Sequence, residues 1–198
     1  MNTTLKYLTL KGNSFSSYNE EEQHEDEGIS WATFPQMPYL LELDIGNCNI
    51  EFIAREVFQN ITGLRKLFMP HNKMLDIPSD TFQLLPHLEY LDLSFTNLLE
   101  IDYRTTHPTL NAVWQLVYGV QIHKDTFKNL NNLTYLDLSH TKVTSNSAMA
   151  FTYLGQSLKF MSLCYTSFPM VGNAFFKNTG LVGLDLSGNP YAAFNFID

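Results

Sequence analysis

One apolar pattern recurs along the whole chain, and it limits the possible folds more than any other feature. The pattern reads LxxLxLxx(N/C/T)x(apolar), and its seven copies begin at Leu5, Leu40, Leu64, Leu88, Leu133, Leu158 and Leu181. Successive copies start 35, 24, 24, 45, 25 and 23 residues apart, which indicates an underlying coil of 24 residues. Repeats of this length cannot bury their apolar side chains alone, so they stack on one another. The sequence therefore predicts one solenoid domain over residues 1–198.

The spacing of the leucines predicts the architecture of each coil, with positions counted from the first leucine of each copy. Side chains at positions 1, 4 and 6 are expected to point inward from a short strand, and strands of successive coils to stack in parallel about 4.8 Å apart. This is the leucine-rich-repeat signature, which implies an α/β solenoid of seven or eight coils with one parallel concave sheet and an irregular or short helical convex side. The leucines expected to be buried in the central coils are Leu64, Leu67, Leu88, Leu91, Leu93, Leu133, Leu136 and Leu138.

Other positions of the coil support the same register. Position 19 carries a phenylalanine in most coils, and the predicted spine comprises Phe34, Phe58, Phe82, Phe127, Phe151 and Phe176. Position 9 carries Asn, Thr or Cys where the chain leaves the strand, and these side chains are expected to hydrogen-bond buried backbone groups. Cys48 occupies this position and is interpreted as a buried structural thiol. Cys164 lies four coils away, about 20 Å or more at the strand spacing, which is beyond disulfide reach.

Two segments depart from the regular spacing. Residues 16–28 contain six of the acidic residues of the chain and are predicted to form a solvated loop, with a specific acidic docking segment as the alternative. Residues 102–122 lie within the longest spacing and have three interpretations: a degenerate eighth coil that begins near Leu110, an inserted loop, or a gene-model error such as retained non-coding sequence. In an eighth coil, Gln115 would fall at position 6, which is unsuited to a buried strand.

Charge and motif content exclude several classes of function. The chain has 12 Lys and Arg against 20 Asp and Glu, and without clustered cations we expect no nucleic-acid partner. No signal peptide or membrane span is recognised, so membrane attachment would come only through parts of a parent protein absent from this sequence. Motifs such as GxSxG, HExxH and CxxC do not occur, and we expect no enzyme activity, no cofactor and no metal site. His71 and His140 are interpreted as ordinary exposed residues because another coil separates them.

The strand sequence LDLS at 91–94, 136–139 and 184–187 and the connector FxN(I/L)xxL at Phe58 and Phe127 resemble those of extracellular leucine-rich-repeat receptors. Toll-like receptor ectodomains and chaoptin-like adhesion proteins are the families of this resemblance. It implies a non-enzymatic ligand-recognition module of a cell-surface or extracellular receptor, of the Toll-like, innate immune or developmental signalling type. The implied partners are a protein or microbial ligand and a second chain in a homo- or heterodimer. The alternatives are a structural cell-adhesion protein of the chaoptin type and an intracellular protein-binding scaffold.

Three N-x-[ST] sequons begin at Asn2, Asn60 and Asn132, and each needs an exposed asparagine in a secretory compartment. They predict an extracellular or cell-surface location as part of a longer membrane protein. Asn60 is expected to be glycosylated most readily, followed by Asn132. The lack of cysteine-rich caps at either end likewise predicts that the sequence belongs to a longer solenoid.

The ligand-binding surface is expected on the concave face, because positions 2, 3, 5, 7 and 8 are not committed to the core. Tyr90, Tyr135 and Phe160 at position 3 should form an aromatic column, with position-5 aspartates beside it and position-8 aromatics at its rim. Aromatic side chains with a few charges are typical of binding hot spots. The predicted site comprises Arg65, Lys66, Phe68, His71, Glu89, Tyr90, Asp92, Phe95, Tyr135, Asp137, His140, Phe160 and Tyr165. The alternative is that these residues are common fillers of this strand type.

Overall fold

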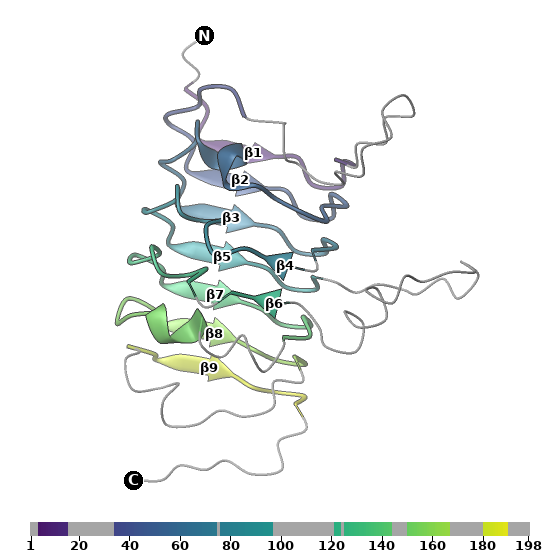
Figure 1. Cartoon of the computed structure of the whole chain (residues 1–198), viewed down its shortest axis with the longest axis vertical. Coiled ribbons are helices and arrows are strands. Elements are labelled where there is room, and N and C mark those ends of the chain that lie inside the picture. The colour runs from purple at the N-terminus through teal and green to yellow at the C-terminus, as the bar shows by residue number, and fades with distance from the viewer. Residues whose placement is uncertain are drawn as a thin grey trace, which may run out of the picture.

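The computed structural model describes residues 4–15, 34–74, 76–96, 121–123, 125–143, 150–166 and 180–189. Seven short strands form one parallel sheet, which Figure 1 shows as a stack along the long axis of the molecule. The strands are β1 Tyr7–Thr9, β2 Glu42–Asp44, β3 Lys66–Phe68, β5 Tyr90–Asp92, β7 Tyr135–Asp137, β8 Phe160–Ser162 and β9 Gly183–Asp185. Their order in the sheet is their order in the chain, so each coil adds one strand. The leucine-rich-repeat solenoid predicted from the repeats is confirmed.

The strand register is the one that the leucine pattern predicts. Leu67 pairs with Leu43 on one side and with Leu91 on the other, so position 4 of each coil stands beside position 4 of the next. Leu136 continues the row between Leu91 and Met161. Because side chains alternate along a strand, positions 3 and 5 point away from the core when position 4 is buried. The pattern thus determines which side chains reach solvent.

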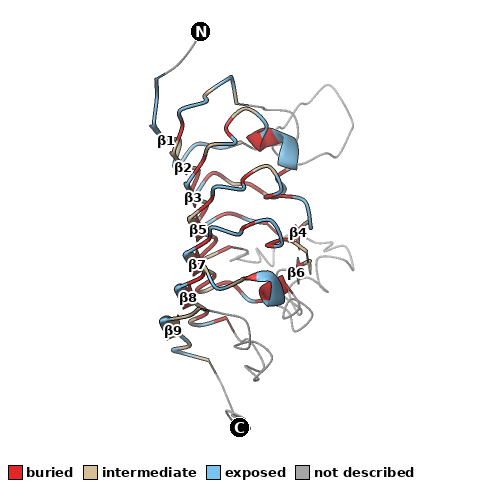
Figure 2. Cartoon of the chain, turned by 90° about the vertical axis from the view of Figure 1, so that its left-hand side faces the viewer, coloured by how far each residue is buried: buried red, intermediate tan, exposed pale blue. Residues whose placement is uncertain are grey.

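The opposite side of the solenoid consists of turns and short elements. The 3-10 helix η1 spans Arg55–Phe58, and residues 150–153 form another 3-10 segment. Strands β4 (Asp76–Ile77) and β6 (Gln121–Ile122) make a second, two-stranded parallel sheet. Figure 2 places these elements across from the main sheet, with buried residues between the two sides. In the described residues, the short helical segments expected on this side are 3-10 turns.

Direct pairing of β5 with β7 is the feature of the sheet closest to the longest spacing between repeats. Tyr90 pairs with Tyr135, so the two strands on either side of that spacing are neighbours in the main sheet. Ile122 pairs with Ile77 of the preceding coil in the two-stranded sheet. Residues 16–33 and 97–120 lie outside the described residues, so the acidic loop and the three interpretations of residues 102–122 stay predictions.

The core between the two sides is continuous across the central coils. All eight leucines that the repeat predicted to be buried have an exposed fraction of 0%. The spine residues Phe58, Phe82, Phe127 and Phe151 are buried as well, with ring centroids 6.3 Å apart in the first pair and 6.0 Å apart in the last. Each such side chain contributes about 1.5–3 kcal/mol through burial. Phe34 is half-buried, and Phe176 lies outside the described residues.

Position 9 satisfies the backbone where each coil leaves the sheet. The amide nitrogen of Asn72 donates to the carbonyls of Ile45 and Met69, and its oxygen accepts from the N–H groups of Cys48 and Ile50. The thiol of Cys48 is buried and donates to the carbonyl of Leu10 over 3.2 Å. Burial also raises the pKa of this thiol, which opposes thiolate formation. Cys48 is therefore the structural thiol that the sequence predicted, and both it and Cys164 are free.

Candidate functional site

The candidate site is the open face of the main sheet, defined as the side chains at positions 2, 3, 5, 7 and 8 of the coils. All thirteen residues of the predicted site lie on strands β3, β5, β7 and β8 or within three residues of them. These strands are consecutive neighbours in the sheet, so the structure brings the predicted residues onto one surface. Figure 2 shows exposed residues along this edge of the solenoid, opposite the 3-10 turns.

The position-3 residues make a stacked aromatic pair at the centre of the open face. The rings of Tyr90 and Tyr135 lie 4.4 Å apart with an interplanar angle of 2°. Phe68, at position 5 of the preceding coil, packs on Tyr90 at 4.9 Å. Phe160 continues the position-3 row but leans over the last strand, because a Cβ at Gly183 would lie 2.7 Å from its Cδ1. Phe160 is 49% exposed, which leaves much of its ring open to solvent.

A second, longer aromatic row runs along position 8, and we call it the position-8 ladder: His71, Phe95, His140 and Tyr165. Successive ring centroids are 4.5, 4.3 and 4.8 Å apart, with interplanar angles of 14°, 8° and 15°. Phe95, in the coil between those of the two histidines, stacks on both of them. His71 is exposed, as expected from the sequence, and His140 is half-buried. The stacking of both imidazoles on Phe95 was not predicted. The ring of Tyr165 extends the ladder over Gly188, where a Cβ would collide with it.

The backbone explains why position 8 projects its side chain in this way. All four ladder residues have positive φ, between 53° and 57°, and the φ values of Asn47, Gly12 and Gly188 at the same position are also positive. In this conformation the N–H of His71 donates to the carbonyl of Ser94, and that of Phe95 donates to Ser139, both at position 7 of the next coil. The backbone ladder therefore continues past the strands, and it holds the position-8 rings one strand spacing apart.

The aromatic residues of the ladder are not explained by stability alone. Glycine adopts positive φ at least cost, and asparagine and histidine adopt it more readily than other residues, whereas a bulky residue such as Phe95 or Tyr165 costs of order 1–3 kcal/mol there. A stacked aromatic pair returns about 0.5–1.5 kcal/mol beyond its burial. Stacking therefore offsets the strain at Phe95 and Tyr165 and adds little net stability. Strained residues of this kind cluster at functional sites, so the ladder is a candidate binding element.

The position-5 aspartates have a structural task, and those at the centre of the open face are half-buried. Oδ1 of Asp92 accepts the N–H of Ser94 over 2.9 Å, and Oδ1 of Asp137 accepts that of Ser139 over 2.8 Å. Asp44 and Asp185 make the same bond to the residue two positions on. The LDLS sequence is thus a turn signal, in which Asp caps the end of its strand. This role was not predicted from the sequence, although an Asp two residues before a Ser is a recognisable sign of it.

The charges on the open face are unevenly balanced. Arg65 pairs with Glu89, and Lys66 pairs with Glu42 over 3.3 Å. Among the described residues, Asp92 and Asp137 have no cationic partner. They stand directly opposite each other on β5 and β7. Burial, together with the charges of Asp137 and Asp44, raises the pKa of Asp92. Burial raises the pKa of the Tyr90 and Tyr135 hydroxyls, and the charges of Asp92 and Asp137 raise it further, so both hydroxyls stay protonated at neutral pH.

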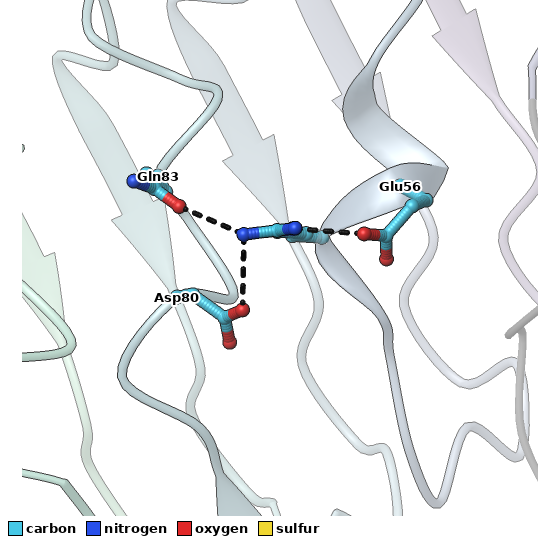
Figure 3. Close-up of polar contacts among 4 residues, drawn as sticks. Glu56, Asp80 and Gln83 are labelled. Carbon is cyan, nitrogen blue, oxygen red and sulfur yellow. Dashed lines mark hydrogen bonds and ion pairs between the residues drawn. The ribbon is translucent and has the colours of Figure 1, made fainter.

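The other side of the solenoid carries an exposed cluster of paired charges. Figure 3 shows Glu56, Asp80 and Gln83 converging on the guanidinium of Arg55, an exposed residue of η1. The Nε atom of Arg55 is 2.8 Å from Glu56 Oε1, and its Nη1 is 3.5 Å from Asp80 Oδ2. Arg55 thus pairs with carboxylates on this side, whereas Asp92 and Asp137 of the open face have no ion-pair partner among the described residues.

The described residues of the open face offer the chemistry of recognition. They contain no group of three or more His, Cys, Asp and Glu that could hold a metal ion. Within the same ranges, no helix has the length and hydrophobicity that crossing a bilayer requires. Stacked rings, hydroxyls and carboxylates on a rigid sheet can bind a partner through stacking, hydrogen bonds and charge.

The two sequons that the structure describes differ in accessibility. The amide nitrogen of Asn60, where a glycan would attach, donates to the carbonyl of Phe34 over 2.7 Å in a half-buried setting. That of Asn132 donates to the carbonyl of Pro86 over 2.9 Å, but Asn132 is exposed. This geometry favours Asn132 and reverses the order expected from the sequence. Asn2 lies outside the described residues.

Comparison with known proteins agrees with the fold. Two family models, both described as leucine rich repeat, match residues 38–99 and 129–151. A segment of 66 residues, 32% of this chain, is 36% identical to Podocan of Mus musculus. The match spans 11% of the length of Podocan. Leucine-rich repeats are in general a non-enzymatic fold that binds proteins on a broad open surface.

Proposed function

We propose that this chain is the ligand-recognition module of an extracellular or cell-surface leucine-rich-repeat receptor, and that it binds a protein ligand on its open face. The observation that carries the proposal is the position-8 ladder beside the Tyr90–Tyr135 pair. These rings are half-exposed, rigidly held and unneeded by the core, and aromatic residues of this kind dominate protein-binding hot spots. The sequons support the extracellular location. The Toll-like type of receptor is the finer part of the proposal and rests on the LDLS resemblance.

The proposal is tested by asking which side of the solenoid binds. The chain, secreted with an added signal peptide and assembled into labelled tetramers, would be used to stain a panel of cells and secreted proteins. Tyr90→Ala with Tyr135→Ala removes the stacked pair of the open face. The matched control is Phe52→Ala with Arg55→Ala on the other side, where Phe52 is 38% exposed. We expect staining to be lost with the open-face pair and kept with the control pair.

Two outcomes would contradict this function. Loss of staining with the control pair alone would place recognition on the other side of the solenoid. Aggregation of beads coated with the chain alone, abolished by the open-face pair, would select like-with-like adhesion in place of a receptor module.

A further inference from the structure

The open face between β5 and β8 has the chemistry of a surface that binds cations. Its aromatic rings lie in two rows, with Tyr90 and Tyr135 in one and Phe95 and His140 in the other. The paired residues Asp92 and Asp137 lie at position 5 between those rows. Aromatic faces and carboxylates both attract guanidinium and ammonium groups.

The described cations nearest to Asp92 and Asp137 on the open face have other partners. Arg65 and Lys66 pair with Glu89 and Glu42. Lys159 Nζ donates to the carbonyl of Gln156 over 2.8 Å. Asp92 and Asp137 therefore face each other as like charges on neighbouring strands, an arrangement that is destabilising. A cation supplied by a partner would relieve this repulsion.

The aspartate geometry favours arginine in the partner. Oδ1 of each aspartate is held by a backbone N–H, so the carboxylate has a fixed orientation. Oδ2 of Asp137 accepts only a long bond of 3.4 Å from the hydroxyl of Tyr135. A guanidinium presents several N–H donors in one plane and stacks on aromatic rings, whereas an ammonium is a point charge. We infer that the open face between β5 and β8 binds an extended polypeptide segment that carries arginine side chains, an inference that rests on the proposed function and specifies its partner.

The test uses a fluorescein-labelled peptide of alternating glycine and arginine, with fluorescence anisotropy as the readout. Three control peptides replace arginine by lysine, by the neutral isostere citrulline, or by glutamate. We expect the order arginine, lysine, citrulline, with no binding of the glutamate peptide. We also expect binding to weaken as salt is raised, because charge drives part of it.

Matched variants separate the site from the net charge of the chain. Asp92→Asn with Asp137→Asn keeps both amide oxygens as acceptors for the turn, so the fold is retained while the charge is lost. We expect at least about tenfold weaker binding of the arginine peptide. Asp185→Asn makes the same substitution at the same position of β9, outside the site, and should leave affinity within about twofold. Tyr90→Leu with Tyr135→Leu should weaken binding, and Tyr7→Leu, at position 3 of β1, should not.

An effect of Asp185→Asn as large, per charge removed, as that of the paired variant would overturn the inference, because binding would then reflect only the net charge of −8. Equal affinity for the citrulline peptide would overturn it as well. If the arginine peptide fails to bind while Tyr90→Ala with Tyr135→Ala still abolishes cell staining, the inference is wrong and the proposed function stands. If the arginine peptide does not bind and the Tyr90→Ala with Tyr135→Ala pair also leaves cell staining unchanged, the proposed function is wrong too.

Discussion

At the scale of single residues, the position-5 aspartates make the same turn bond in opposite electrostatic settings. Burial raises the pKa of Asp92, whereas hydrogen bonds from Ser187 lower the pKa of Asp185. Because its folded pKa is raised, Asp92 contributes to the stability of the fold below its unfolded pKa of about 4. This contribution is lost as pH rises through the folded pKa. The contribution of Asp185 is present above about pH 4 and is lost as pH falls through its folded pKa.

Asp92→Asn should therefore change stability with pH in the opposite sense to Asp185→Asn. We compare the free energy of unfolding of each variant with that of the unsubstituted chain. The difference should favour Asp92→Asn more near pH 7 than near pH 3.5, and it should favour Asp185→Asn less near pH 7 than near pH 3.5. Urea unfolding at the two pH values measures both differences. The same sign for both variants would contradict the assigned environments.

The position-8 ladder gives a second prediction at this scale. Phe95→Asn removes two stacked contacts but relieves a positive φ that asparagine adopts readily. We expect a loss in the free energy of unfolding of no more than about 1.5 kcal/mol, because strain relief offsets part of the lost stacking. Urea unfolding measures it, and a loss of about 3 kcal/mol or more would make the ladder a structural element. Binding by the open face should fall even though the fold is kept.

At the scale of the element, each strand contributes according to its neighbours. Leu91 on β5 is fully buried between two strands, whereas Leu8 on the edge strand β1 is half-buried. Leu91→Ala should cost about 2–5 kcal/mol, through lost transfer energy and a cavity that cannot collapse. Leu8→Ala, its matched position-4 control, should cost clearly less. Similar losses measured by chemical unfolding would contradict the register.

The repeat predicted those elements whose cause lies within one coil. Leu91 and Asn72 follow directly from period and position, because position 4 is buried in each of the central coils and position 9 makes its hydrogen bonds from coil to coil. The ladder was missed because stacking depends on which coils are adjacent, and Phe95 and His140 are 45 residues apart in the chain. This long spacing hid that they are neighbours, and the pairing of β5 with β7 reveals it.

At the scale of the whole molecule, the position-8 ladder and the Asn132 sequon lie at opposite ends of the strands of the main sheet. The position-8 ladder lies just after the strands, where each coil turns away from the sheet. Asn132 lies before β7, at the other end of the strands, and its exposed side chain donates to the carbonyl of Pro86. A glycan there would leave the ladder and the Tyr90–Tyr135 pair uncovered. Glycosylation and recognition are thus compatible on one solenoid.

This division predicts which sequon is used when the chain is secreted from a glycosylating host with an added signal peptide. Asn132 should be occupied to a greater extent than Asn60, because Asn60 donates to Phe34, accepts from Gln36 over 2.7 Å and is half-buried. Glycosidase release in heavy water followed by peptide mass spectrometry measures both occupancies. Thr62→Ala, which destroys only the Asn60 sequon, should then leave most of the glycan mass in place. Higher occupancy at Asn60 would contradict the prediction, and unmodified asparagine at both sites in folded, secreted material would remove the main support for an extracellular location.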